Sequence, residues 1–304
     1  MRAFAVFLAL ILIALASIGV LTYPAWLLLH PHFDFPFHRI GERIAMLVGL
    51  VGFLILAPRM RLGDRTSLGY GIPPRTFARE LLVGLATGVV TMAVIVAAMA
   101  AIGLRDWHKA ASLDALQLTK LVVQSLASGL VVALIEETAI RGIIFTGIQR
   151  ESGTVVAVVL TSLIYAASHF FAKHHIEASQ VTSSSGWELL AGTLHSFAAP
   201  LAIADAFLTY FAIGVILAAI RSSTGHIASC MGLHAGWVWV LLTVTGTSAA
   251  ARGRPLSWLL TTSDSQTDVV GWLVLAWCVA IGFPLVRYFA RRGPSLTRSP
   301  RLAV

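Results

Sequence analysis

The residues of this chain that could do chemistry are ionisable side chains within long apolar segments. Residues 131–145 read VVALIEETAIRGIIF and carry Glu136, Glu137 and Arg141, while His169 and His234 lie in two later apolar segments. Ionisable groups are costly in apolar surroundings and by default indicate function. These five residues are therefore the candidate catalytic residues.

The spacing suggests different roles for these groups. Glu137 and Arg141 are four residues apart, so on a helix they share a face and are in the favourable order for an ion pair. Glu136 points about 100° away around the helix and stays free for chemistry. A carboxylate and an imidazole can bind a water between them and remove its proton, and a second imidazole can donate to the oxyanion that forms.

A structural interpretation competes with this one. Buried acids, imidazoles and a guanidinium can form a polar network that only holds helices in register. Two acids, two imidazoles and one guanidinium from three separate segments exceed what packing alone needs, so the sequence favours a catalytic site.

The elements that position these residues are membrane helices. Of the 304 residues, 57% are hydrophobic and only 12% are charged, whereas soluble domains carry about a quarter charged residues. A membrane-spanning helix needs about 20 mostly apolar residues, which predicts an all-α, polytopic transmembrane bundle of about eight spans, the second of them short. The candidate spans are 3–29, 44–57, 81–104, 121–147, 155–171, 201–220, 227–245 and 269–289.

The net charge of +8 comes from clusters beside these spans. With both termini in the cytoplasm, the predicted inside residues are Arg2, Arg59, Arg61, Arg65, Arg75, Arg79, Arg150, Arg221, Arg287, Arg291, Arg292, Arg298 and Arg301. Fewer fall outside: Arg39, Arg43, Arg105, Lys109, Lys120, Lys173, Arg252 and Arg254. This bias fits a multi-pass protein of the cell (inner) membrane, and without a basic helix or an aromatic platform we expect no nucleic-acid partner.

Three local features complete the predicted organisation. We divide the chain into N-terminal helices (1–120), a catalytic core (121–246) with its cavity among spans four to seven, and a C-terminal helix with a basic tail (247–304). The first span is interpreted as an uncleaved anchor, residues 187–197 as an interfacial or re-entrant segment, and the pair Gly84 and Gly88 as a close helix contact.

The ordered motifs resemble a known family. Glu136-Glu137-Thr138-Ala139-Ile140-Arg141, then Tyr165 to His169, then His234 to Val238 are similar to the three signatures of the CPBP family, which contains the CAAX prenyl proteases and bacteriocin-processing enzymes (Abi domain). The resemblance implies that Glu136 and His169 activate water, that Glu137 and Arg141 support them, and that His234 helps to hold the oxyanion.

Two positions depart from the family pattern. Tyr165 stands where phenylalanine is usual, and Val238 stands where the family has an asparagine. The chain contains no asparagine at all, so the missing donor must come from Trp237, Thr243, a backbone amide or a bound water. Loss of one oxyanion donor costs about 100- to 1000-fold in rate.

The implied function is that of an intramembrane, glutamate-type endopeptidase, CAAX prenyl endopeptidase-like, with a membrane-associated or lipid-anchored protein as substrate, the bilayer as its other partner and no cofactor. Three alternatives stay open. They are a non-catalytic immunity or binding protein of the same fold, a proton-coupled transporter, and a zinc enzyme in which Glu136, His169 and His234 bind the metal.

Overall fold

The fold is an all-α bundle with helices of membrane-spanning length. The computed structural model describes residues 1–171, 174–261 and 269–292; Lys173, Arg298 and Arg301 lie outside these ranges. Within them, seven helices are long and apolar enough to cross a membrane. They are α1 (Arg2–Leu29), α2 (Phe37–Arg59), α3 (Pro74–Ala101), the continuous segment Ala115–Ser152, Pro200–Thr224 with α9 (Ala204–Thr224), α10 (Ala228–Thr247) and α11 (Trp272–Arg292).

An eighth apolar helix, α7 (Thr154–Ser168), has only 15 residues. At 1.5 Å per residue it extends roughly 22 Å, less than the thickness of the hydrocarbon core. It corresponds to the predicted span 155–171, so seven of the eight predicted spans have a helix of membrane-spanning length. The predicted short span was wrong in one respect: α2 has 23 residues and is of full length, and α7 is the short one.

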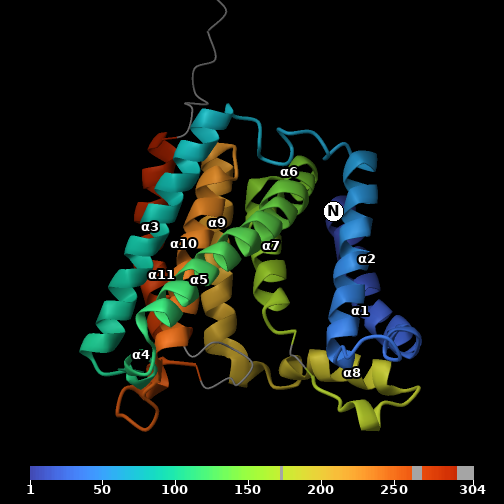
Figure 1. The fold of residues 1–304 in the computed structure, drawn as a ribbon. Helices are drawn as coiled ribbons and strands as arrows, with labels where there is room; N and C mark the ends of the chain where they lie inside the picture. Colours follow the sequence, from blue (N-terminus) through green and yellow to red (C-terminus); the bar gives the residue numbers. More distant parts are fainter. Residues whose placement is uncertain (172–173, 262–268, 293–304) are drawn as a thin grey trace, which may run out of the picture.

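The arrangement in Figure 1 places α1 and α2 as a pair at one side of the bundle and α3, α5 (Ala115–Glu136), α9, α10 and α11 at the other, with α7 between them. Helix α10 packs against α3 and α5, and α9 packs against α7 and α11. The helices that carry the candidate residues therefore pack directly on other helices of the bundle, α5 on α10 and α7 on α9.

The contact between α3 and α10 depends on small residues. A Cβ atom at Gly84 would lie 2.5 Å from the carbonyl oxygen of Ser229, and one at Gly88 would meet the carbonyl oxygen of Leu233. Gly236 faces this contact from α10. The predicted close approach at Gly84 and Gly88 is confirmed, and it fixes the backbone of α10 beside His234.

The fourth span changes helix type where the acidic pair lies. Helix α5 ends at Glu136, a π-helix (η1, Glu137–Ile144) follows, and α6 (Phe145–Ser152) completes a continuous segment of 38 residues. π-Helical turns are rare and occur often at functional sites. The three charged residues of the first motif thus lie at or inside this irregular turn.

The short elements lie at the two ends of the bundle. Helix α8 (Ser185–Leu194) lies across the end of the bundle that also carries α4 (His108–Ala111), as Figure 1 shows. It covers most of segment 187–197, whose interfacial or re-entrant position stays a prediction. A two-residue antiparallel pairing joins β1 (Arg105–Asp106) to β2 (Ala249–Ala250). The remaining short elements are the 3-10 turns η2 (Ala178–Gln180), η3 (His195–Ala198), η4 (Pro200–Ile203) and η5 (Ser257–Leu259).

The opposite end collects Met1, the last described residue Arg292 and several other basic residues. The amino group of Met1 lies 3.1 Å from Glu151 at the end of α6, and Arg292 at the end of α11 lies 3.1 Å from Glu80 near the start of α3. Arg150 donates to the backbone carbonyl of Arg61. Both described ends thus lie on one side of the bundle, as the charge pattern predicts, and the cellular side they face remains a prediction.

Candidate active site

The first motif forms a fully buried ion pair with a third partner. Arg141 Nη1 lies 3.1 Å from Glu137 Oε1, and both side chains have no exposed surface. His234 Nδ1 lies 2.9 Å from the same oxygen, and His234 is only 3% exposed. The predicted contact between Glu137 and Arg141 is present, and Glu137 also joins η1 to α10.

Glu136 differs from its neighbour. Its side chain is 31% exposed, and its Oε2 lies 3.9 Å from His234 Nε2, which is too long for a hydrogen bond. Oε2 has no hydrogen-bond partner among the described residues. Of the two adjacent carboxylates, Glu136 is therefore the one left available to a water or a substrate.

His169 lies at the C-terminal end of α7, facing the same region. Its Nδ1 is 2.8 Å from the carbonyl oxygen of Tyr165, and because a carbonyl only accepts, Nδ1 must carry the hydrogen. In the neutral ring, Nε2 then keeps its lone pair. The ring stacks on Tyr210 of α9, with 4.0 Å between centroids, which fixes the plane of the imidazole.

Two cavities meet at His169. The outer one has a volume of about 270 Å³ and is lined by Ile135, Glu136, Ala139, Ile140, Ser168 and His169. Ile135 is 57% exposed on this apolar helix, so this cavity opens on the face that a membrane helix turns toward lipid. His169 also lines the inner cavity.

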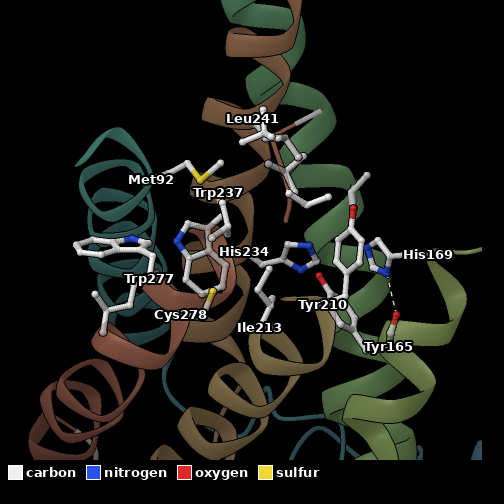
Figure 2. Close-up of a pocket in the computed structure, with 16 residues that line it drawn as sticks. Met92, Tyr165, His169, Tyr210, Ile213, His234, Trp237, Leu241, Trp277 and Cys278 are labelled. Atoms are coloured by element: carbon white, nitrogen blue, oxygen red, sulfur yellow. Dashed lines mark hydrogen bonds between the residues drawn. The ribbon is translucent and has the colours of Figure 1, made fainter. Parts of the chain in front are cut away.

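The inner cavity has a volume of about 230 Å³ and lies among α3, α5, α7, α9, α10 and α11. Figure 2 shows Tyr165, His169, Tyr210 and His234 grouped on one side of it, with Trp237, Trp277 and Cys278 on the other. The predicted cavity among spans four to seven therefore also has walls from α3 and α11.

Arg141 is held by more than its carboxylate. Its guanidinium lies 4.4 Å from the centre of the Tyr165 ring, and Nη2 donates to the carbonyl oxygen of Gly214 at 3.4 Å. Arg221 Nε donates to the backbone carbonyl of Arg141 at 3.1 Å. These contacts join η1 to α7 and α9.

Sequence reasoning missed two of these residues. Tyr210 gave no signal, because a tyrosine in an apolar span is ordinary. Arg221 was assigned to the charged residues beside the membrane, but it is 6% exposed and hydrogen-bonded inside the protein. Arg221 lies close to the end of its apolar segment, where basic residues usually face the membrane surface. Only the packing of the helices shows that its side chain points into the protein.

The departures from the family pattern lie in the inner cavity. Val238 and Tyr165 both line it, while two of the suggested replacement donors are already committed. Trp237 Nε1 donates to Thr91 Oγ1 at 2.9 Å, and the Thr243 hydroxyl donates to the Trp239 carbonyl at 2.8 Å. Tyr165 is 2% exposed, so its ring is enclosed between the cavity and Arg141.

The geometry of a metal centre is also absent from the described part of the chain. No three or more His, Cys, Asp and Glu side chains there are close enough together to hold a metal ion. The two imidazoles, His169 and His234, line the inner cavity. Glu136 lines the outer cavity together with His169.

Comparison with known families agrees with the motif order. Residues 118–240 match the model of the Rce1-like family, described as type II CAAX prenyl endopeptidase Rce1-like. This segment is therefore similar to the CAAX proteases, which supports the resemblance that the motifs indicate. The match covers all five candidate residues together with η1, α6, α7 and α9 and most of α5 and α10. No curated protein and no solved structure matches the chain significantly.

The seven membrane-length helices and the similarity to a family of membrane proteases together indicate a multi-pass integral membrane protein, with the lipid bilayer as one partner. Helices α1 to α3 and α11 lie outside the matched residues. The inner cavity therefore has walls from two helices, α3 and α11, that lie outside the matched residues.

Proposed function

We propose that this protein is a glutamate-type intramembrane endopeptidase that hydrolyses a peptide bond of a membrane-associated or lipid-anchored protein. The observation that carries the proposal is the unequal environment of the two carboxylates. Glu137 is fully buried and bonded to Arg141 and His234, whereas Glu136 is partly exposed beside His169. This difference supports a positioning role for Glu137 and a chemical role for Glu136.

In this mechanism, Glu136 and His169 bind a water molecule at the boundary of the two cavities. Glu136 takes one proton of the water as its oxygen attacks the scissile carbonyl carbon, and an oxyanion forms on the carbonyl oxygen. The proton then passes to the leaving amine as the C–N bond breaks. The reaction consumes one water and one peptide bond, yields a carboxyl group and an amine, and needs no further reactant.

The oxyanion needs hydrogen-bond donors. His234 donates from Nε2 when it carries a proton on both ring nitrogens, with Nδ1 donating to Glu137 at 2.9 Å. That state balances the charges of Glu136, Glu137 and Arg141, which matters because unpaired charges are costly in the interior. We assign the second donor to the Tyr165 hydroxyl, because Val238 cannot donate and Trp237 is bonded to Thr91.

The lipid-facing position of the outer cavity supports the substrate class. A peptide that enters beside Ile135 arrives from the bilayer and meets Glu136 and His169 first. A substrate anchored in the membrane close to the cleaved bond therefore fits the site best.

The direct test is a comparison of cells that express wild-type protein or Glu136→Gln. A membrane protein that accumulates uncut in the variant identifies the substrate, and purified Glu136→Gln in nanodiscs should fold like wild type but fail to cleave it. Equal cleavage by both proteins would overturn the mechanism. No accumulating protein in any condition would favour the non-catalytic alternative, for which Val238 is the supporting feature.

A second measurement separates the proposal from a zinc mechanism. A carboxylate and imidazole site should keep full activity after dialysis against a strong chelator, and elemental analysis should find no stoichiometric metal. One tightly bound zinc per chain, with activity lost on its removal and recovered on its return, would overturn the role of Glu136 as general base.

A further inference from the structure

Two tryptophans form the wall of the inner cavity that faces the candidate catalytic residues. Trp237 comes from α10 and Trp277 from α11. Figure 2 shows both rings across the cavity from His169 and Tyr165. Trp277 lies outside the family match at residues 118–240, so the family signatures do not account for it.

One residue holds both rings. Trp237 Nε1 donates to the side-chain oxygen of Thr91 at 2.9 Å, and Trp277 Nε1 donates to the backbone carbonyl of Thr91 at 3.0 Å. The Thr91 hydroxyl in turn donates to the carbonyl of Thr87 at 2.8 Å. Because each indole N–H is satisfied away from the cavity, the rings are fixed and present apolar surface to it.

The rest of the lining at this side is also apolar, with Met92, Val274, Cys278 and Ile281 beside the two rings. The volume of about 230 Å³ decides what fits. Pockets for drug-sized ligands are roughly 300–1,000 Å³, and an apolar cavity of about 150 Å³ holds benzene. The cavity is therefore the size of one large apolar side chain.

We propose that this cavity is a specificity subsite for one bulky apolar side chain of the substrate, and that Trp277 sets its depth while Thr91 positions its walls. The proposal rests on the proposed protease function, because the cavity begins at His169 and His234. A substrate side chain that fills it places the neighbouring peptide bond beside these imidazoles. Small or charged side chains leave the apolar walls unfilled or lose their hydration.

The test uses a binding readout that needs no turnover. The probe is an N-acetylated Gly-X-Gly amide in which X is a photoreactive diazirine leucine, irradiated with the Glu136→Gln protein in nanodiscs. We expect mass spectrometry to locate the cross-links at Met92 and at residues 274–281. Unlabelled peptides with phenylalanine or leucine at X should compete at least about tenfold better than the alanine peptide.

Variants of the wall then test the assignment. Trp277→Ala should move the best competitor to the tryptophan peptide, because the subsite becomes deeper. Thr91→Val should weaken the selection among competitors, and Thr91→Ser should retain it, because serine keeps the hydroxyl that accepts from Trp237. Trp239→Ala is the matched control: Trp239 lies on α10, donates to the Val122 carbonyl and does not line the cavity.

Cross-links outside the cavity, or an order of competitors that Trp277→Ala leaves unchanged, would overturn the subsite. The outcome is separable from that of the proposed function. A specific competition series together with full cleavage by Glu136→Gln would leave the subsite standing and remove the glutamate mechanism. If the peptides compete equally but cleavage still depends on Glu136, the glutamate mechanism stands and the subsite is removed.

Discussion

At the scale of the residue, the adjacent glutamates have different roles because their surroundings differ. Glu137 Oε1 accepts from Arg141 and His234 in a fully buried environment, while Glu136 Oε2 has no hydrogen-bond partner in the described part of the chain. Removing one partner of a buried ion pair leaves an uncompensated charge, which is more costly than removing both. Changes at this site should therefore be strongly non-additive.

That reasoning gives the first prediction. Arg141→Ala should destabilise the protein by about 3 to 5 kcal/mol, measured as a lower unfolding temperature in detergent. Glu137→Gln added to Arg141→Ala should recover part of the loss, because glutamine is neutral and its carbonyl oxygen can still accept from His234. Strictly additive effects in this double-mutant cycle would show that the two side chains do not interact.

The second residue-scale prediction concerns the oxyanion. Tyr165→Phe should lower kcat by about 100- to 1000-fold with little change in KM, because it removes a donor that acts in the transition state. Adding Val238→Asn to Tyr165→Phe should restore part of the rate, since an amide donor returns to the cavity. An unchanged rate in Tyr165→Phe would exclude its hydroxyl as the donor.

At the scale of the element, the position of His234 depends on how closely α10 approaches α3. The glycines at 84, 88, 232 and 236 let the two backbones come into contact, and added Cβ atoms there would meet backbone of the facing helix. The π-helix η1 is fixed in a similar way, because a Cβ at Gly142 would lie 2.8 Å from the carbonyl oxygen of Leu68. Close backbone contacts of this kind do not tolerate added volume.

The element-scale prediction compares two glycine-to-valine changes. Gly88→Val should cost roughly 1 to 3 kcal/mol by overpacking and should reduce cleavage, because it moves α10 and its histidine away from Glu136. Gly49→Val is the control, since nothing lies within 4 Å of a Cβ at that position on α2. Thermal unfolding in detergent and a cleavage assay measure the two effects. Equal behaviour of the two variants would contradict a requirement for close contact.

At the scale of the whole molecule, both described ends and many basic residues lie at one end of the bundle. Arg150 contacts Arg61 and Ser67 there, and α4, α8 and the short β pairing lie at the other end (Figure 1). The excess of basic residues beside cytoplasmic ends of membrane helices predicts which end faces the cytoplasm.

Labelling of single introduced cysteines tests this orientation. Gly63 and Ser112 are exposed and follow α2 and α4, respectively; the end of α2 that leads to α3 and helix α4 lie at opposite ends of the bundle in Figure 1. The natural cysteines Cys230 and Cys278 are buried. In intact cells, a membrane-impermeant maleimide should label Ser112→Cys at once and Gly63→Cys only after permeabilisation, with the unsubstituted protein as background. The opposite pattern would reverse the orientation, and labelling of both from outside would contradict the predicted eight crossings.

The sequence by itself determined the fold class, the approximate spans and the set of candidate residues. Apolar segments of bilayer length exclude a soluble chain, and charges inside them are too costly to be incidental. The helical spacing of four residues was enough to predict the pair of Glu137 and Arg141. These features are local along the chain, so their physical consequences follow from it directly.

Only the tertiary structure decided which of these side chains contact one another. Nothing in the spacing places His234 on Glu137, because 97 residues separate them. The inward position of Arg221, the stacking of Tyr210 on His169 and the cavity wall of Trp277 likewise depend on which helix faces which. In a membrane that choice is made by close packing of small residues and by buried polar contacts rather than by hydrophobicity, and hydrophobicity is the property that a sequence displays most clearly.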